Sequence, residues 1–316
     1  MILTMRLRKL VKVITAFMFG AGLPALVIAA DPEPSALSLQ ARVSLPALPE
    51  LSGLAASRRR PGLWWALNDS GNAPTLVALD QRGQVLGSVR VQGQINHDWE
   101  DLASFEDEDG RWLLVGDIGD NFGLRGEILL MLLPEPDPQD RTVTPARLLR
   151  VSWEDGARDA ESLAVDVGAR RVLLADKGRR PAGLYAVPLD GPGPTATARR
   201  IADFPELAPG PPPRARSIAS MRWRGTPTAI DLSPDGLSLT VLTAEGLSLF
   251  HRAPGQRWAE ALREPASHWV SISRLSVAGY EAAAFSADAR SVLIGNEGEE
   301  IHLMRWALQM PAGPAP

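Results

Sequence analysis

A short pattern that recurs five times constrains the fold of this chain more than any other feature. Each copy has one or two polar residues, then Leu or Ala, then a small residue, and the copies lie at residues 52–55, 100–103, 161–164, 230–233 and 281–284. A second apolar run follows every copy and ends in polar residues 13 to 15 positions after this Leu or Ala. A near-constant offset within copies and a variable spacing between them predict a repeated β-hairpin with loops of variable length.

Two further strand-like runs follow the hairpin in the first four copies, so each copy has the four antiparallel strands of a β-propeller blade. Gly110 and Gly236 supply the positive φ that two of the hairpin turns need. The fifth copy is one strand short, and residues 37–45 ahead of the first copy offer that strand. We therefore predict an all-β fold, a single β-propeller of five four-stranded blades closed by an N-terminal strand. A six-bladed ring with one degenerate blade and a β-sandwich are the alternatives.

The first thirty residues have the layout of a secretory signal peptide. Four basic residues precede an apolar run over 13–28, and two Ala residues stand before Asp31. We predict a signal peptide over 1–30, a propeller domain over 31–316, and a periplasmic or secreted protein. An uncleaved membrane anchor is the alternative, and no later apolar run is long enough to span a bilayer.

Composition excludes several classes of function. The chain has no Cys, which excludes disulfides, thiol catalysis and thiolate metal sites. Cleavage would remove four of the 33 basic residues and none of the 37 acidic ones, giving a net charge of −8 that argues against a nucleic-acid partner. The sequence has no Gly-x-Ser-x-Gly elbow, His-Glu-x-x-His pair, Walker loop or dinucleotide fingerprint, and its four His residues are too scattered for a zinc site.

Propeller geometry predicts that acidic residues of all five copies meet at one mouth of the central channel. The start of each innermost strand lies beside the end of the second strand, because the two are antiparallel. The residues predicted there are Glu100, Asp101, Glu161, Asp231 and Glu281 from the innermost strands, and Asp69, Asp117, Asp176, Glu245 and Glu297 from the second strands. Converging carboxylates raise each other's pKa unless solvent screens them or a cation neutralises them. A solvated acidic rim without a cation is the alternative interpretation.

A hard cation suits this set of side chains, since Ca²⁺ takes roughly six to eight oxygen ligands. The loop after the second strand of the second copy adds further oxygen donors and a Gly that permits a tight turn. The twelve-residue EF-hand loop is absent. We predict a divalent cation, in the first place Ca²⁺, held by Asp69, Glu100, Asp101, Asp117, Asp120, Asn121 and Glu161.

Residues around the same mouth are the candidates for ligand binding. Lys177 is the only Lys after the first thirty residues, and beside Asp176 its ammonium would neutralise carboxylates or hold an anionic ligand. Trp99 would form an apolar wall there, unless it packs between blades. His97 and Asp98 also stand near this rim, where a solvated surface His is the simpler interpretation. The predicted ligand-binding residues are Asn68, Trp99, Asp176, Lys177 and Glu281.

Four stretches resemble a group of uncharacterised exported bacterial β-propellers, and the resemblance extends over most of the chain after residue 30. The stretches are residues 51–55 (LSGLA), 67–71 (LNDSG), 98–103 (DWEDLA) and 116–121 (GDIGDN). Residues 161–164 (ESLA) and Glu281 are more distantly similar to the Glu-Gly-hydrophobic-Ala repeats of esterase-like and phytase-like propellers. That second resemblance implies calcium and phosphoester chemistry. The cationic candidates for a phosphate group are Lys177, Arg125, Arg179 and Arg224.

Two functions of different class follow from these features. In the first, the chain is an exported propeller whose acidic mouth binds a divalent cation and a small molecule or protein partner. In the alternative, it is a metal-dependent hydrolase of phosphoesters or related esters, in which the cation polarises the scissile group and a carboxylate activates water. The lack of a clear nucleophile and the few cationic residues near the mouth favour the first. We expect a monomer.

Overall fold

The described part of the chain is almost entirely β-strand. This computed structural model describes residues 37–44, 48–178, 180–191, 193–209, 224–273 and 275–308. They belong to one unit, residues 31–316, and the predicted signal peptide over 1–30 lies outside them. Within these ranges α2 (Trp258–Ala261) is the one α-helix, and no helix there is long and apolar enough to cross a membrane.

Consecutive strands pair into groups of four. The first group is β2 (Leu51–Ala56), β3 (Trp64–Asn68), β4 (Thr75–Leu79) and β5 (Val85–Val91). The second is β6 (Trp99–Asp107), β7 (Gly110–Asp117), β8 (Ile128–Pro134) and β10 (Arg147–Trp153). The third is β11 (Ala160–Asp166), β12 (Arg171–Asp176), β13 (Gly183–Pro188) and β14 (Thr195–Asp203). The fourth is β15 (Ala229–Leu232), β16 (Ser238–Leu242), β17 (Gly246–His251) and β18 (His268–Ser271).

The last group joins the two ends of the described chain. It consists of β19 (Tyr280–Phe285), β20 (Ser291–Asn296), β21 (Glu300–Ala307) and β1 (Leu37–Ser44). β1 pairs antiparallel with β21, which confirms the predicted role of the N-terminal strand. Val43 of β1 is only 1% exposed, because it packs against Leu293 and Leu303 in the apolar core of this group.

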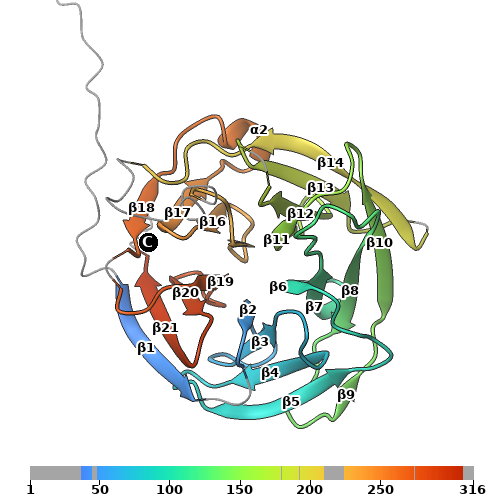
Figure 1. The fold of residues 1–316 in the computed structure, drawn as a ribbon, viewed down its shortest axis with the longest axis vertical. Coiled ribbons are helices and arrows are strands. Elements are labelled where there is room, and N and C mark those ends of the chain that lie inside the picture. The colour runs from blue at the N-terminus through green and yellow to red at the C-terminus, as the bar shows by residue number, and fades with distance from the viewer. Residues whose placement is uncertain are drawn as a thin grey trace, which may run out of the picture. The chain divides into compact units, whose positions relative to one another are not determined.

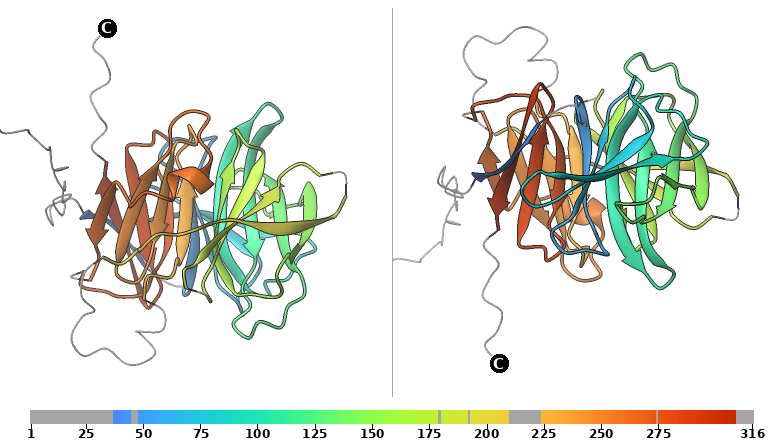
Figure 2. Two further views of the ribbon diagram at one scale, coloured as in Figure 1. Left: turned by 90° about the horizontal axis from the view of Figure 1, so that it is seen from above. Right: turned by 90° about the horizontal axis from the view of Figure 1, so that it is seen from below.

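The first strand of each group lies nearest to a common centre. β2 contacts β6, β6 contacts β11, β11 contacts β15, β15 contacts β19, and β19 contacts β2 again (Figure 1). The side views show these strands running along the viewing direction of Figure 1 (Figure 2). The predicted all-β, propeller-like fold is thereby confirmed at this level.

Hydrogen bonds between outer strands differ from the prediction of separate four-stranded sheets. β10 pairs in parallel with β14, from Arg150 opposite Thr195 to Trp153 opposite Ala198, so the second and third groups form one eight-stranded sheet. The short strand β9 (Thr142–Val143), which the sequence pattern missed, pairs in parallel with β5. These pairings satisfy backbone groups at outer edges that would otherwise be open.

The core lies between neighbouring groups of strands. The innermost strands are buried along most of their length, because both of their faces pack against other strands. Gly53 permits the close approach of β2 to β6, since a Cβ there would lie 2.8 Å from the Leu102 nitrogen. This tight packing fixes the ends of the innermost strands, where the chemically active side chains stand.

Candidate functional site

Four innermost strands have a β-bulge at the residue that begins the repeat. The pairing register shifts at Ser52 in β2, Glu100 in β6, Glu161 in β11 and Glu281 in β19. A bulge leaves one residue out of the ladder and re-aims its side chain, as is common beside binding sites. These four side chains, which we call the bulge residues, therefore occupy equivalent positions.

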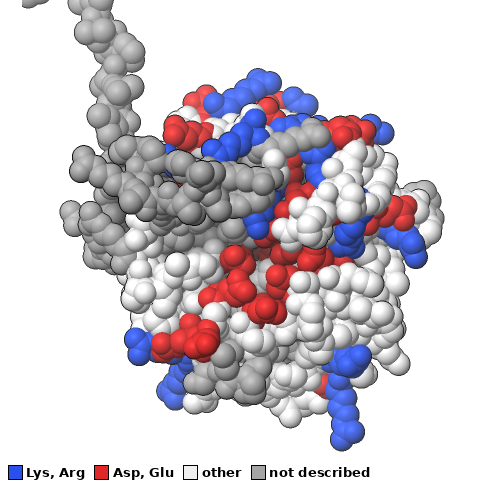
Figure 3. All heavy atoms as spheres, in the orientation of Figure 1, with Lys and Arg blue, Asp and Glu red and all other residues white. Residues whose placement is uncertain are grey.

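A second set of equivalent residues follows the second strand of the same groups. Each donates its backbone N–H, over 2.8–3.0 Å, to the carbonyl oxygen of the residue two positions before a bulge residue. We call them the rim residues: Asp69, Ile118, Lys177 and Glu297. Acidic side chains gather at the centre of this face of the molecule (Figure 3).

Three carboxylates form the tightest cluster of oxygen donors in this set. Ligand oxygens of Asp69, Asp98 and Glu100 all lie within 4.8 Å of one another. That spacing fits oxygens around one cation at about 2.3–2.6 Å, the range of Ca²⁺ sites. The single Ser52 Oγ–H has the Glu100 carbonyl oxygen as its near acceptor (2.5 Å) and Glu100 Oε2 as a more distant one (3.3 Å). The donors are all oxygens, which hard cations prefer.

Burial and like charges disfavour the ionised form of these carboxylates. Burial raises the pKa of Glu100 far above its usual range, and the charges of Glu161, Asp69 and Asp98 raise it further. Burial, followed by the charge of Asp69, also raises the pKa of Asp98. A bound cation would reverse this penalty, because it stabilises the ionised form of all three groups.

The other half of the mouth holds an ion pair and a second acidic pair. Lys177 Nζ lies 2.6 Å from Glu161 Oε1. Burial raises the pKa of Glu161 to about 7, against the opposing effect of Lys177. Burial also raises the pKa of Glu281 to about 7, and the charges of Glu161 and Glu297 add to the effect. Both carboxyls therefore change protonation near neutral pH.

The structure brings together five of the predicted site residues and adds Asp98, which the sequence places near the rim but which is not among the predicted ligands. The five are Asp69, Glu100, Glu161, Lys177 and Glu281. Asp98 joins the tightest cluster, and its signal in the sequence is an acidic residue two positions before a bulge residue. The same spacing places Asp159 before Glu161, where Asp159 accepts a hydrogen bond from the Asp120 nitrogen (2.9 Å).

The structure does not bring Asp101 into this cluster. Its carboxylate accepts hydrogen bonds from the backbone nitrogens of Leu102 (2.7 Å) and Leu163 (2.8 Å), and thereby ties β6 to β11. Asp231 does the same between β15 and β19, where it accepts from the Phe285 nitrogen (2.8 Å). Asp101 follows the bulge residue directly, and a step of one residue turns a side chain to the other face of a strand.

Asp117 also lies outside the cluster, for a related reason. It is the last residue of β7, one position before the rim residue Ile118. Its carboxylate is fully buried, pairs with Arg125 Nη2 (2.7 Å) and accepts from the His97 nitrogen (3.2 Å). Asn68 holds the equivalent position in the first group, and its side-chain oxygen accepts from the Glu50 nitrogen (3.1 Å). Both side chains fix the loops beneath the mouth.

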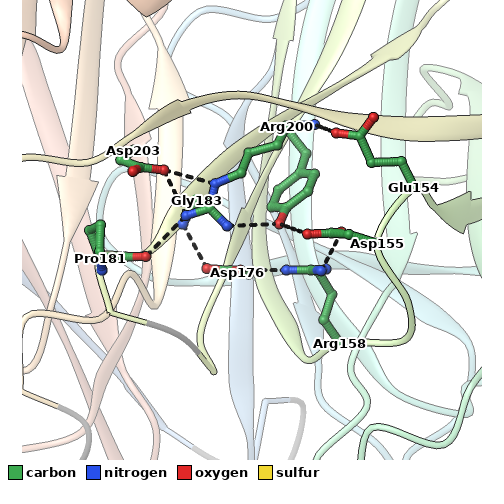
Figure 4. Close-up of polar contacts among 9 residues, drawn as sticks. Glu154, Asp155, Arg158, Asp176, Pro181, Gly183, Arg200 and Asp203 are labelled. Carbon is green, nitrogen blue, oxygen red and sulfur yellow. Dashed lines mark hydrogen bonds and ion pairs between the residues drawn. The ribbon is translucent and has the colours of Figure 1, made fainter.

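Asp176 is the third residue of this kind. It ends β12, pairs with Arg158 Nη1 (2.8 Å) and accepts from the Gly183 nitrogen (2.7 Å). Figure 4 shows Arg158 between Asp176 and Asp155. Tyr185 extends the network, since its hydroxyl donates to Asp155 (3.3 Å). Asp176 is among the predicted ligand-binding residues, but its side chain fixes the backbone beside the rim residue Lys177.

The remaining predicted ligands belong to the loop after β7 and to the core. Asp120 accepts hydrogen bonds from the backbone nitrogens of Leu124 and Arg125 (both 2.8 Å), which shapes this loop. Asn121 is exposed on the same loop. Trp99 is fully buried and packs with Trp65 between the first two groups of strands, so it forms no wall of the mouth.

Two features of the loop after β7 border the three-carboxylate cluster. A Cβ at Gly119 would lie 2.4 Å from both Asp98 Oδ2 and Glu100 Oε1, so only Gly fits there. Phe122 and Leu124 are 86% and 82% exposed, which gives the loop an apolar tip.

The cationic candidates for a phosphate group are mostly engaged elsewhere. Arg125 donates to the Gly119 carbonyl oxygen (2.7 Å) as well as pairing with Asp117. Arg224 donates to the Ala208 carbonyl oxygen (2.6 Å). Arg179 lies outside the described residues. Lys177 is thus the candidate cation that stands among the carboxylates of the mouth.

Fold and site define an all-β, propeller-like protein with a carboxylate-lined mouth. No protein-family model matches the chain, and no curated protein matches it. Among solved structures, the chain is similar to a gluconolactonase from Xanthomonas campestris at 15% identity, with 82% of this chain and 72% of that chain covered and a TM-score of 0.47. It is also similar to a luciferin-regenerating enzyme at 15% identity, with 81% and 76% covered and a TM-score of 0.43.

Proposed function

We propose that the acidic mouth binds a divalent cation, in the first place Ca²⁺, and that the bound cation recognises a small molecule or protein partner. The observation that carries the proposal is the cluster of Asp69, Asp98 and Glu100, whose ligand oxygens lie within 4.8 Å of one another. Glu100 is only 4% exposed, so solvent does little to screen it from the neighbouring carboxylates. A cation among them would remove the cost of that arrangement.

The donor set favours Ca²⁺ over other metals. Zinc and copper sites in proteins usually include His or Cys ligands, and this cluster offers only carboxylate oxygens. Mg²⁺ demands near-octahedral geometry, whereas Ca²⁺ accepts irregular sets of carboxylates, carbonyls and water. Asp69, Asp98 and Glu100 supply such an irregular set, because they come from different strand ends and loops.

The proposal includes the architecture and location of the protein. We take the five groups of strands as five blades, which is supported by the closed order of contacts among the innermost strands. We also propose export with cleavage between residues 30 and 31, on the basis of the basic and apolar start of the sequence. Sequencing the N-terminus of protein from the cell envelope should then give Asp31 first, and a full-length cytoplasmic chain would contradict it.

A metal-dependent hydrolase is the second candidate, and one observation favours it. Glu161 has a pKa of about 7, stands beside Lys177 and neighbours the proposed cation site. A carboxylate with such a pKa can accept a proton from water at neutral pH. A bound cation would polarise the scissile ester, lactone or phosphoester group.

Thermal unfolding with and without metal tests the cation site. Ca²⁺ should raise the Tm of the protein, and a chelator should lower it. At a Ca²⁺ concentration about a thousandfold above Kd, the free energy of unfolding should rise by about 4 kcal/mol. Glu100→Gln should abolish most of this response, because it removes a charge at nearly constant shape. Glu106→Gln is the matched control, since Glu106 is exposed at the other end of β6. An identical response in both variants would show that the cation binds elsewhere.

A substrate screen separates the two candidates. Purified protein with Ca²⁺ is tested on phosphoesters, carboxylic esters and lactones, and Glu161→Gln is tested beside it. The hydrolase predicts activity that falls about 10²–10⁴-fold in Glu161→Gln while the Tm response to Ca²⁺ persists. If the unchanged protein hydrolyses none of these substrates, the hydrolase candidate fails and cation-dependent binding remains.

A further inference from the structure

A pocket lies at the far end of the innermost strands from the acidic mouth. Its volume is about 390 Å³, within the range of small-molecule sites. Ser104 lines it, and Ser104 stands four residues after Glu100 on β6. Residues at or just after the ends of all five innermost strands contribute to its wall, among them Arg58, Ser104, Val165, Asp231 and Ala287.

Arg58 presents an incompletely satisfied guanidinium to this pocket. Its Nε donates to Ser104 Oγ (3.1 Å), and its Nη2 donates to the Ser104 carbonyl oxygen (3.0 Å). Its Nη1 makes no hydrogen bond and no ion pair with any described residue. Burial lowers the pKa of Arg58, against the attraction of Asp231, Glu135 and Glu106.

Asp231 presents a carboxyl group to the same pocket, and burial raises its pKa to about 7. It is buried, and the hydrogen bond from the Phe285 nitrogen holds its Oδ2 in place. Arg58 and Asp231 both line the pocket, yet they form no ion pair with each other. Both residues therefore belong to the wall that one bound ligand would contact.

The other charged residues of the wall are already compensated or solvated. Arg252 pairs with Asp166 (2.7 Å), and Glu106 pairs with Arg111 (3.0 Å). Asp235 is exposed and accepts a hydrogen bond from the Leu237 nitrogen (3.0 Å). Arg58 and Asp231 are thus the two charges of this pocket that a ligand would complete.

We propose that this pocket binds a small zwitterion of the α-amino acid class. The ligand carboxylate accepts hydrogen bonds from Arg58 Nη1, and its ammonium donates to Asp231. Phe105, Val165 and Leu232 give the wall an apolar part for the side chain of the ligand. A ligand with a carboxylate but no ammonium would leave Asp231 without a partner. A ligand with an ammonium but no carboxylate would leave Arg58 without one. The proposal does not depend on the cation site at the other end of the strands.

Matched ligands test the charge pattern on the unchanged protein. The twenty standard amino acids are screened by thermal shift at about 10 mM, which detects even millimolar Kd values. L-Leucine is then compared by calorimetry with L-leucinamide, which lacks the carboxylate, and 4-methylpentanoate, which lacks the ammonium. We expect L-leucine to bind at least about tenfold more tightly than either analogue, because each analogue leaves one buried charge unpaired. No shift with any amino acid, or equal binding of the analogues, would overturn the proposal.

Two variants assign the two charges to their residues. Arg58→Gln should weaken L-leucine binding to the level of L-leucinamide and leave L-leucinamide unaffected. Asp231→Asn should abolish the preference for L-leucine over 4-methylpentanoate and can keep the hydrogen bond from Phe285. Arg82→Gln, at an exposed position outside the pocket wall, is the control and should bind as the unchanged protein does. If either Arg58→Gln or Asp231→Asn retained the full preference in a cooperatively folded protein, the zwitterion would not lie between these residues.

Discussion

A single step along the chain separates the carboxylates that face the mouth from those that hold the fold together. Glu100 and Asp101 are neighbours of the same charge, but the bulge turns Glu100 toward Asp69 and Asp98, whereas Asp101 accepts two backbone hydrogen bonds. In the same way, Asp117 lies one position before the rim residue Ile118 and so does not face the mouth. The chemical role of an acidic residue in this protein therefore depends on register more than on identity.

Asp101 should matter for stability and not for the metal. Asp101→Ala leaves the backbone nitrogens of Leu102 and Leu163 without their acceptor, so the free energy of unfolding should fall by about 2 kcal/mol or more. The stabilisation by added Ca²⁺ should remain. Urea unfolding with and without Ca²⁺ measures both, with Glu106→Ala as the exposed control; a lost Ca²⁺ response would place Asp101 among the ligands after all.

Gly119 should be essential for the proposed cation site. A methyl group at this position would lie 2.4 Å from carboxylate oxygens of both Asp98 and Glu100, so Gly119→Ala should push them apart and weaken Ca²⁺ binding about tenfold or more. Gly126→Ala is the matched control in the same loop, because a Cβ there meets nothing within 4 Å. Calorimetric titration with Ca²⁺ compares the two, and equal Kd values would contradict the assignment.

At the scale of strands, the apolar pattern predicts most of the architecture. The five repeats locate the innermost strands, and residues 37–45 contain the closing strand β1, which is observed from Leu37 to Ser44. The pattern could not predict the short β9 or the parallel pair of β10 and β14, because such edge pairing depends on how outer strands meet in space. It also could not predict the bulges, which offset the pairing by one residue and so misplaced Asp117 and Asp176.

Strand β1 should be needed for a soluble fold. Deletion of residues 37–44 would expose the edge of β21 and remove Val43 from the core, whose burial alone stabilises by about 2 kcal/mol. We expect a lower Tm and concentration-dependent aggregation, measured by calorimetry and light scattering. Arg42→Ala is the control, because the pair of Arg42 with Glu300 is exposed and contributes little; an unaltered deletion variant would argue against closure.

The charge balance of the mouth should govern the pH dependence of stability for the whole molecule. Glu161 and Glu281 each have a pKa of about 7 in the folded protein and an ordinary value of 4.5. Between these values the folded protein binds more protons than the unfolded one, so the free energy of unfolding falls as pH rises from about 4.5 to about 7. Added Ca²⁺ should reduce this fall, because it stabilises the ionised carboxylates.

Urea midpoints from pH 4.5 to 8, with chelator or with Ca²⁺, measure this dependence. Glu281→Gln should make the curve obtained with chelator less steep, since it removes one of the groups whose pKa is raised in the folded protein. Exposed Glu264 serves as the control position, and Glu264→Gln should leave the curve unchanged. Stability that rises over this range in the unchanged protein, and is unaltered in Glu281→Gln, would show that these carboxyls do not set it.

The pairing of β1 with β21 also determines when the molecule can be completed. β1 and β21 are the first and the last of the described strands, so β1 has no partner until β21 has been synthesised. The first groups of strands can assemble earlier from contacts that are local in sequence, but the ring stays open at one edge during that time. Ring closure is therefore a slow, long-range step, and a chaperone that covers β1 would act before that step.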